Sequence, residues 1–155
     1  MIRHKPIIFI FVIGIWMVLG CSGKHVIVQN DNTLTLDGCS LLPNCVSSTA
    51  WAFYNSTSPF ELSIPGNEAW PMIKEIISNI PRTEIMEVSD TYIHARCRTR
   101  VFRFIDHLEL VLHPVENTIS VRSSSTLAIF DLGVNRLRIY NLRKQLIEKK
   151  IIKPS

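Results

Sequence analysis

Arg122 to Arg138 reads RSSSTLAIFDLGVNRLR, and the rest of the chain can be organised around this stretch. A strand pattern ends at its serines and a helix pattern begins near Asp131, so the stretch is predicted to be a strand-to-helix junction. Such a junction leaves backbone groups free, and the start of a helix favours anions. The candidates for a ligand site are four polar residues of this stretch, Arg122, Asp131, Asn135 and Arg136, together with Asp106.

Four segments before the helix show the alternation of apolar and polar residues that is typical of strands. They cover residues 84–88, 91–99, 104–113 and 118–123, with turn residues at 89–90 and 113–117 between them. Connections as short as these favour pairing of neighbouring segments in opposite directions. The sequence therefore predicts an antiparallel meander of four strands.

Helical periodicity flanks these strands on both sides. The first helix is predicted to begin at Asn67 as its N-cap and to end before Pro81. The second is predicted to be capped by Asp131, with an apolar stripe made of Leu132, Ile139, Leu142 and Leu146 and with Val134 and Leu137 beside it. The predicted fold is α+β in two layers, a four-stranded antiparallel sheet with a helix before it and a helix after it.

Alternation also assigns the side chains of the sheet to two faces. Asp106 falls on the apolar face, and because an unpaired buried carboxylate is costly, we expect Arg122 or Arg136 to pair with it. The opposite face carries a row of arginines, Arg96, Arg98 and Arg100. This row is either a solvated face with cross-strand partners such as Glu109, or an anion-binding surface of forked donors.

The beginning of the chain has the pattern of an export signal. Arg3, His4 and Lys5 precede an apolar run over 6–19 that is short for a membrane span, which needs roughly 20 residues. The run ends in Val18-Leu19-Gly20-Cys21, which resembles the bacterial lipobox. We therefore predict a lipoprotein signal peptide over 1–20 and a lipid anchor on Cys21, and Ser22 favours the periplasmic face of the outer membrane over the inner membrane.

The remaining chain is predicted to be a tether over 21–36 followed by a single domain over 37–150. Removal of the signal peptide takes away Arg3 and Lys5 and no acidic residue, so the formal net charge falls from +4 to +2. So small a charge on an exported protein argues against a nucleic-acid partner. The predicted partners are instead the membrane, through Cys21, and a small anionic ligand or another envelope protein.

Three cysteines remain after lipidation of Cys21. Cys39 and Cys45 are six residues apart, and an exported location favours a disulfide between them, with Cys97 left as a buried thiol. The alternative is a zinc site made of these three cysteines and a histidine. It lacks the usual spacing of a ligand pair, so we predict no metal and no cofactor.

Several separate blocks carry a family resemblance. They are Leu42–Ser48 (LPNCVSS), Phe104–Asp106 (FID), Arg122–Ser125 (RSSS) and Asp131–Ile139 (DLGVNRLRI). In this order they resemble the signature blocks of the domain of unknown function 1499 family, from about residue 37 to 146, although His107 stands where the family usually has a second aspartate. The resemblance implies a small exported or membrane-associated domain, and it implies no reaction, cofactor or catalytic residue.

Two functional hypotheses follow. In the first, the protein is a non-catalytic lipoprotein that binds a partner or a small anionic ligand at the junction. In the second, it is a cell-envelope hydrolase that uses Asp106, His107 and the serines at 123–125, which are suitable groups for nucleophilic catalysis. Adjacent residues of a strand point to opposite faces, so Asp106 and His107 could share a site only through a bulge, which favours the first hypothesis.

Overall fold

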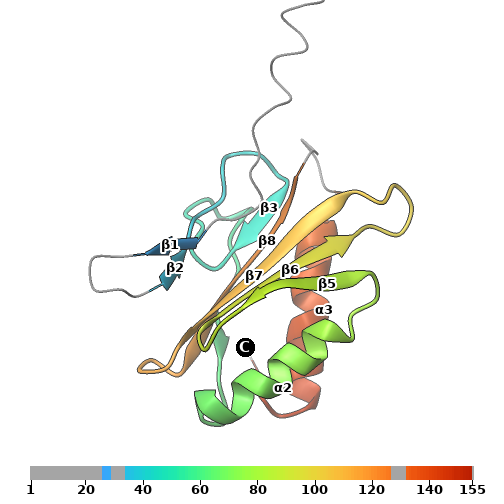
Figure 1. The fold of residues 1–155 in the computed structure, drawn as a ribbon. Coiled ribbons are helices and arrows are strands. Elements are labelled where there is room, and N and C mark those ends of the chain that lie inside the picture. The colour runs from blue at the N-terminus through green and yellow to red at the C-terminus, as the bar shows by residue number, and fades with distance from the viewer. Residues whose placement is uncertain (1–25, 29–33, 127–131, 155) are drawn as a thin grey trace, which may run out of the picture.

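The fold was analysed in a computed structural model, which describes residues 26–28, 34–126 and 132–154 (Figure 1). The helices are α2 (Gly66–Ser78) and α3 (Val134–Glu148). The longer strands are β5 (Thr83–Val88), β6 (Tyr92–Arg98), β7 (Ile105–His113) and β8 (Thr118–Ser125). The shorter ones are β1 (Val26–Val28), β2 (Leu34–Leu36), β3 (Cys45–Ser47) and β4 (Phe60–Glu61).

The main sheet is antiparallel, as predicted, but it has six strands rather than four. The predicted meander is present as β5-β6-β7-β8, paired in chain order. Two short strands, β3 and β4, pair with different parts of the outer edge of β8, at 122–124 and 118–119. They are too short to show alternation along the chain, and together they cover an edge that would otherwise expose unpaired backbone groups.

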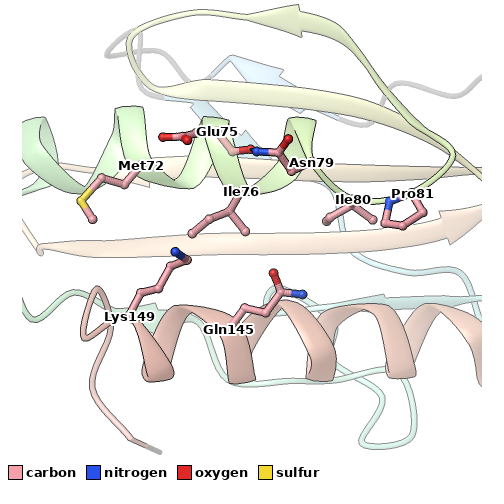
Figure 2. A pocket seen from close by; sticks show the side chains of 8 residues that line it. All are labelled: Met72, Glu75, Ile76, Asn79, Ile80, Pro81, Gln145 and Lys149. Carbon is pink, nitrogen blue, oxygen red and sulfur yellow. The ribbon is translucent and has the colours of Figure 1, made fainter.

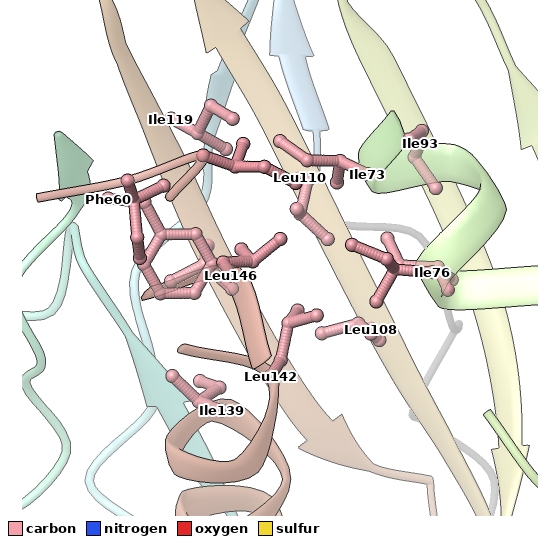
Figure 3. Packing of buried hydrophobic residues seen from close by; sticks show 14 of the residues in the cluster. Phe60, Ile73, Ile76, Ile93, Leu108, Leu110, Ile119, Ile139, Leu142 and Leu146 are labelled. Carbon is pink, nitrogen blue, oxygen red and sulfur yellow. The ribbon is translucent and has the colours of Figure 1, made fainter. Parts of the chain in front are cut away.

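The two helices lie on the same side of this sheet and bury its apolar face (Figure 1). The α+β class and the antiparallel sheet with two helices are therefore confirmed, but the sheet does not lie wholly between the helices in chain order, because β3 and β4 precede α2. Figure 3 shows how side chains from both helices and from the sheet meet in one core, which includes Ile73 and Ile76 of α2, Ile93, Leu108, Leu110 and Ile119 of the sheet, and Ile139, Leu142 and Leu146 of α3.

The starts of both helices differ from the prediction. The N-cap of α2 is Pro65, without a side-chain cap, so Asn67 is already inside the helix. The N-cap of α3 is Gly133 in the left-handed region (φ 77°), where glycine is favoured; the predicted cap, Asp131, lies outside the described residues. Because α3 begins after Leu132, that leucine is 88% exposed, and the buried stripe starts instead with Asn135.

A second small layer lies on the other face of the sheet. Strands β1 and β2 pair with each other, and β2 contacts β7 and β8. Leu36 packs there with Tyr92 and Val111, and all three are buried. The strand β2 is part of the stretch 21–36 that was predicted as a tether. The polar face of the sheet is therefore partly covered, which the two-layer prediction did not include.

The structure contains the predicted disulfide between Cys39 and Cys45, whose Cα atoms are 5.6 Å apart. Cys97 is a buried free thiol, as predicted. Within the described ranges, no cluster of His, Cys, Asp and Glu side chains could hold a metal ion. In the same ranges, no helix has the length and apolar character needed to cross a membrane. The predicted signal peptide and Cys21 lie outside the described residues.

Candidate functional site

The helix-facing side of the sheet ends in a group of polar residues that we call the inner cluster. It consists of Asp106, Ser123, Ser125, Asn135 and Arg138. Register brings the first three together, because Asp106 pairs with Ser125 across β7 and β8 and Ser123 faces the same side two residues earlier. Asn135 and Arg138, which are three residues apart on α3, lie over them.

Arg138 is the residue that pairs with Asp106. Its Nη2 is 2.5 Å from Asp106 Oδ2, and its Nη1 donates to Ser123 Oγ at 2.8 Å and to Asn135 Oδ1 at 2.6 Å. The prediction that Arg122 or Arg136 would pair with Asp106 is therefore wrong. Asp106 is 1% exposed, so this ion pair is almost completely removed from solvent.

Asn135 connects three parts of the fold. Its Nδ2 donates to the carbonyl of Asn44, just before β3, at 3.0 Å and to Ser125 Oγ at 2.9 Å. Its Oδ1 accepts from Ser123 Oγ at 2.7 Å as well as from Arg138. Both donor hydrogens and both acceptor positions of this fully buried amide are thus used, which identifies Asn135 as a clamp between β3, β8 and α3.

The opposite face of the sheet carries an outer cluster of Tyr92, Glu109, Arg122 and Ser124. Arg122 Nη1 donates to Glu109 Oε2 at 3.0 Å and to Ser124 Oγ at 2.8 Å, and Tyr92 Oη donates to Glu109 Oε1 at 2.7 Å. Arg122 and Glu109 are directly opposite each other on neighbouring strands, and both are buried. Burial lowers the pKa of the Arg122 guanidinium, while the adjacent Glu109 carboxylate acts in the opposite direction.

Two histidines form a chain beside the outer cluster. His94 Nε2 is 2.8 Å from His107 Nδ1, and His107 Nε2 is 3.0 Å from the hydroxyl of Thr126. The two rings are stacked, with centroids 5.1 Å apart. Asp106, the neighbour of His107, makes its contacts in the inner cluster on the other face. The acid and the histidine of the hydrolase hypothesis therefore contact different groups on opposite sides of the sheet.

Arg136 points away from both clusters. Its Nη2 donates to the carbonyl of Tyr54 at 2.6 Å and its Nη1 to the carbonyl of Ser56 at 3.3 Å. Further along α3, Arg143 bonds to the carbonyls of Ser58 and Pro59 in a similar way. The two arginines together hold the loop before β4 against the helix.

The candidate residues from the sequence are thus distributed over three places. Arg122 is in the outer cluster, Asp106 and Asn135 are in the inner cluster, and Arg136 is at the surface; Asp131 lies outside the described residues. Sequence reasoning missed Arg138. Its spacing of three residues after Asn135 and four before Leu142 is the signal that could have placed it on the inner side of α3.

A separate groove of about 330 Å³ lies between the two helices, away from these clusters. Figure 2 shows Ile76 of α2, Gln145 of α3 and Lys149, the residue after α3, pointing into the space between the helices. The groove is lined by Met72, Glu75, Ile76, Asn79, Ile80, Pro81, Gln145 and Lys149. None of the candidate residues that the structure describes borders it.

Comparison with known families gives a match over residues 35–146, to the family described as "Protein of unknown function (DUF1499)". The match covers both polar clusters, the whole main sheet and all of α3 except its last two residues. No curated protein and no solved structure matches the chain.

Proposed function

Since the chain belongs to the DUF1499 family of proteins of unknown function, we propose its function from its motifs and from the geometry of its polar residues. The protein is a lipid-anchored component of the bacterial cell envelope, on the periplasmic face of the outer membrane. Its domain is a non-catalytic binding module. The module binds a small anionic ligand, or an anionic group of a partner protein, at the start of α3.

The main support for a non-catalytic domain is that the buried carboxylates of the two clusters are paired with side chains of the same clusters. Asp106 is held by Arg138, and Glu109 is held by Arg122 and Tyr92. A general acid or base needs access to a substrate proton, whereas both of these carboxylates are buried beneath their partners. Such pairing supports a structural role for the acidic residues and favours a binding function over a hydrolytic one.

The start of α3 supports the anion-binding part. Among the described residues no side chain caps this helix, and its first intrahelical bond runs from Leu137 N to the carbonyl of Gly133. The backbone N–H groups of the first turn lie at the positive end of the helix dipole, which favours an anion. Arg136 is exposed in this first turn, and no acidic side chain pairs with it among the described residues. Asp106 and Asn135 hold this turn against the sheet through the hydrogen bonds of the inner cluster.

Inorganic phosphate should stabilise the protein through this site. At ten times its dissociation constant, a ligand that binds only the folded state adds about 1.4 kcal/mol to the free energy of unfolding. We expect this gain, measured by urea unfolding with and without phosphate at constant ionic strength, to be lost in Arg136→Gln. Arg143→Gln is the matched control, because Arg143 bonds to loop carbonyls from the same helix but lies far from its start. If both variants keep the gain, there is no anion site at the start of α3.

Lipidation of Cys21 has a direct test in cells. Labelled palmitate should enter the wild-type protein, and the label should be lost in Cys21→Ser, together with recovery of the protein in the outer-membrane fraction. Several acyl chains, at about 0.8 kcal/mol per buried methylene, anchor a protein stably, so the change in fractionation should be nearly complete. An unlabelled wild-type protein, or unchanged fractionation of Cys21→Ser, would contradict the anchor.

A further inference from the structure

The hairpin between β6 and β7 ends in a loop, residues 99–104, that we call the hairpin tip. Two hydrogen bonds close its base: Thr99 N donates to the carbonyl of Phe104 at 3.0 Å, and Phe104 N donates to Thr99 Oγ1 at 2.9 Å. Arg103 has a positive φ of 56°, which is uncommon for a residue with a side chain. The closed base therefore presents residues 100–103 as a defined projection from the end of the sheet.

The side chains of this tip are apolar and exposed. Val101 is 76% exposed, Phe102 67% and Phe104 45%. The rings of Phe102 and Phe104 stack on each other, with centroids 5.4 Å apart, rather than packing into the core. Grouped exposed apolar side chains of this kind mark a surface that meets another apolar phase or molecule.

Positive charge surrounds these apolar side chains. Arg98, Arg100 and Arg103 flank them, and residues 91–105 include no Asp or Glu. None of the three arginines forms a salt bridge with an acidic side chain in the part of the chain that the structure describes, whereas Arg96, two residues before Arg98, is paired with Glu84. The tip therefore combines exposed apolar side chains with a cationic rim that forms no salt bridge within the described residues.

Strand register places this tip at one defined end of the molecule. Cys97 pairs with Asp106, Asp106 with Ser125, and Ser124 with Cys45, so the tip, the end of β8 and the segment before β3 share one end of the sheet. Leu41 and Leu42, in the segment before β3, are also exposed. The β7–β8 turn, with Val115, lies at the opposite end of the sheet (Figure 1).

We propose that the hairpin tip binds the surface of an anionic lipid bilayer, with Phe102 and Phe104 entering the interface and Arg98, Arg100 and Arg103 contacting lipid phosphates. Aromatic side chains beside arginines have the composition of an interfacial contact, because the rings enter the acyl boundary while guanidinium groups stay among the headgroups. The lipobox at residues 18–21 predicts that such a surface lies next to the protein. The tip would fix the orientation of the domain, a role that the lipid anchor alone does not provide.

Two labelled positions test this contact in the full chain carrying Cys21→Ser. Val101→Cys and Val115→Cys each receive an environment-sensitive fluorophore; Val115 is the matched control because it is a valine that is 94% exposed at the other end of the sheet. The protein is incorporated into vesicles of phosphatidylcholine with phosphatidylglycerol. We expect a severalfold rise in fluorescence at position 101, quenched by nitroxide-labelled lipid, and little change at position 115. Equal signals at the two positions would overturn the proposal.

Charge dependence separates a lipid contact from a protein contact. At low salt each arginine near an anionic membrane changes the binding constant about fivefold. The double variant Arg100→Gln with Arg103→Gln should therefore weaken binding of the hairpin tip to the vesicles roughly 25-fold. The signal at position 101 should also fall in vesicles of phosphatidylcholine alone. A rise that needs no vesicles and grows with protein concentration would instead identify a second copy of the chain as the occupant and overturn the proposal. If instead Cys21 is not lipidated, the Cys21→Ser variant will fractionate in cells like the wild type, and this outcome does not depend on the fluorescence at position 101.

Discussion

Replacement of Arg138 by methionine is expected to lower the free energy of unfolding by about 3 to 5 kcal/mol. The reason is the carboxylate that it leaves behind. Asp106 is 1% exposed, Arg138 is its only ion-pair partner within the described residues, and Asp106 Oδ1 has no hydrogen-bond partner there. Removal of one member of a buried pair leaves an uncompensated charge, and this loss exceeds what the pair itself contributes. Chemical unfolding of the wild-type and variant proteins measures the difference.

Two further variants show whether charge is the cause. A double variant, Asp106→Leu with Arg138→Met, removes both charges, and it should recover a large part of the lost stability. Lys144→Ala breaks an exposed pair with Glu148 on the same helix, and it should cost about 0 to 1 kcal/mol. If Arg138→Met costs no more than Lys144→Ala, the inner cluster does not hold α3 to the sheet.

The long strands could be predicted because their signal is local. Alternation over β7 placed Leu108, Leu110 and Leu112 on one face together with Asp106, and the structure has this arrangement. The short strands β3 and β4 could not be predicted in the same way. Strands of three and two residues show no period, and their positions are set by the free edge of β8, which lies more than 50 residues away in the chain.

The partner of Asp106 could not be predicted because it depends on the rotation of α3. The predicted helix had Asp131 as its cap and Leu132 in its buried stripe, whereas α3 begins at Val134 and turns Asn135 and Arg138 toward the sheet. This rotation decides between Arg136 and Arg138 on α3, whereas Arg122 lies on β8 and pairs with Glu109 on the other face of the sheet. Charge alone made each of them a possible partner.

Burial of the outer cluster also depended on a distant segment. Alternation along β7 and β8 puts Glu109 and Arg122 on the same face, and they are paired across these two strands. It could not show that this part of the face would be covered, because the covering strand, β2, lies in a polar stretch that was interpreted as a tether. The same pair would have little effect on stability at an exposed position.

Because this second pair is buried, Glu109→Gln is also expected to cost about 3 to 5 kcal/mol. The substitution keeps the volume of the side chain, but it removes the carboxylate that pairs with the Arg122 guanidinium, in a site where burial already lowers the pKa of that group. Glu84→Gln is the matched control on the same sheet. It removes the exposed partner of Arg96 and should change the unfolding free energy little. Equal effects of the two substitutions in chemical unfolding would show that the outer cluster is not closed to solvent.

Tyr92 provides a test of the same cluster by pH. Burial, followed by the charge of Glu109, raises the pKa of Tyr92 well above its ordinary value of 10.0. Above pH 10 the unfolded chain loses the tyrosine proton while the folded protein keeps it. The contribution of Tyr92 to the free energy of unfolding is therefore complete below pH 10 and declines as the pH rises further. Tyr92→Phe loses a hydrogen bond to a carboxylate, which costs about 1.5 to 3 kcal/mol at neutral pH.

The gap in unfolding free energy between wild type and Tyr92→Phe should therefore narrow between about pH 10 and about pH 11. Tyr140→Phe serves as the control, since Tyr140 is 61% exposed on α3 and its hydroxyl is open to solvent. Its difference from wild type should stay nearly constant over the same range. A gap for Tyr92→Phe that does not change with pH would mean that the phenol ionises equally well in the folded protein. Solvent would then reach Glu109, and the strand β2 would not close the outer cluster.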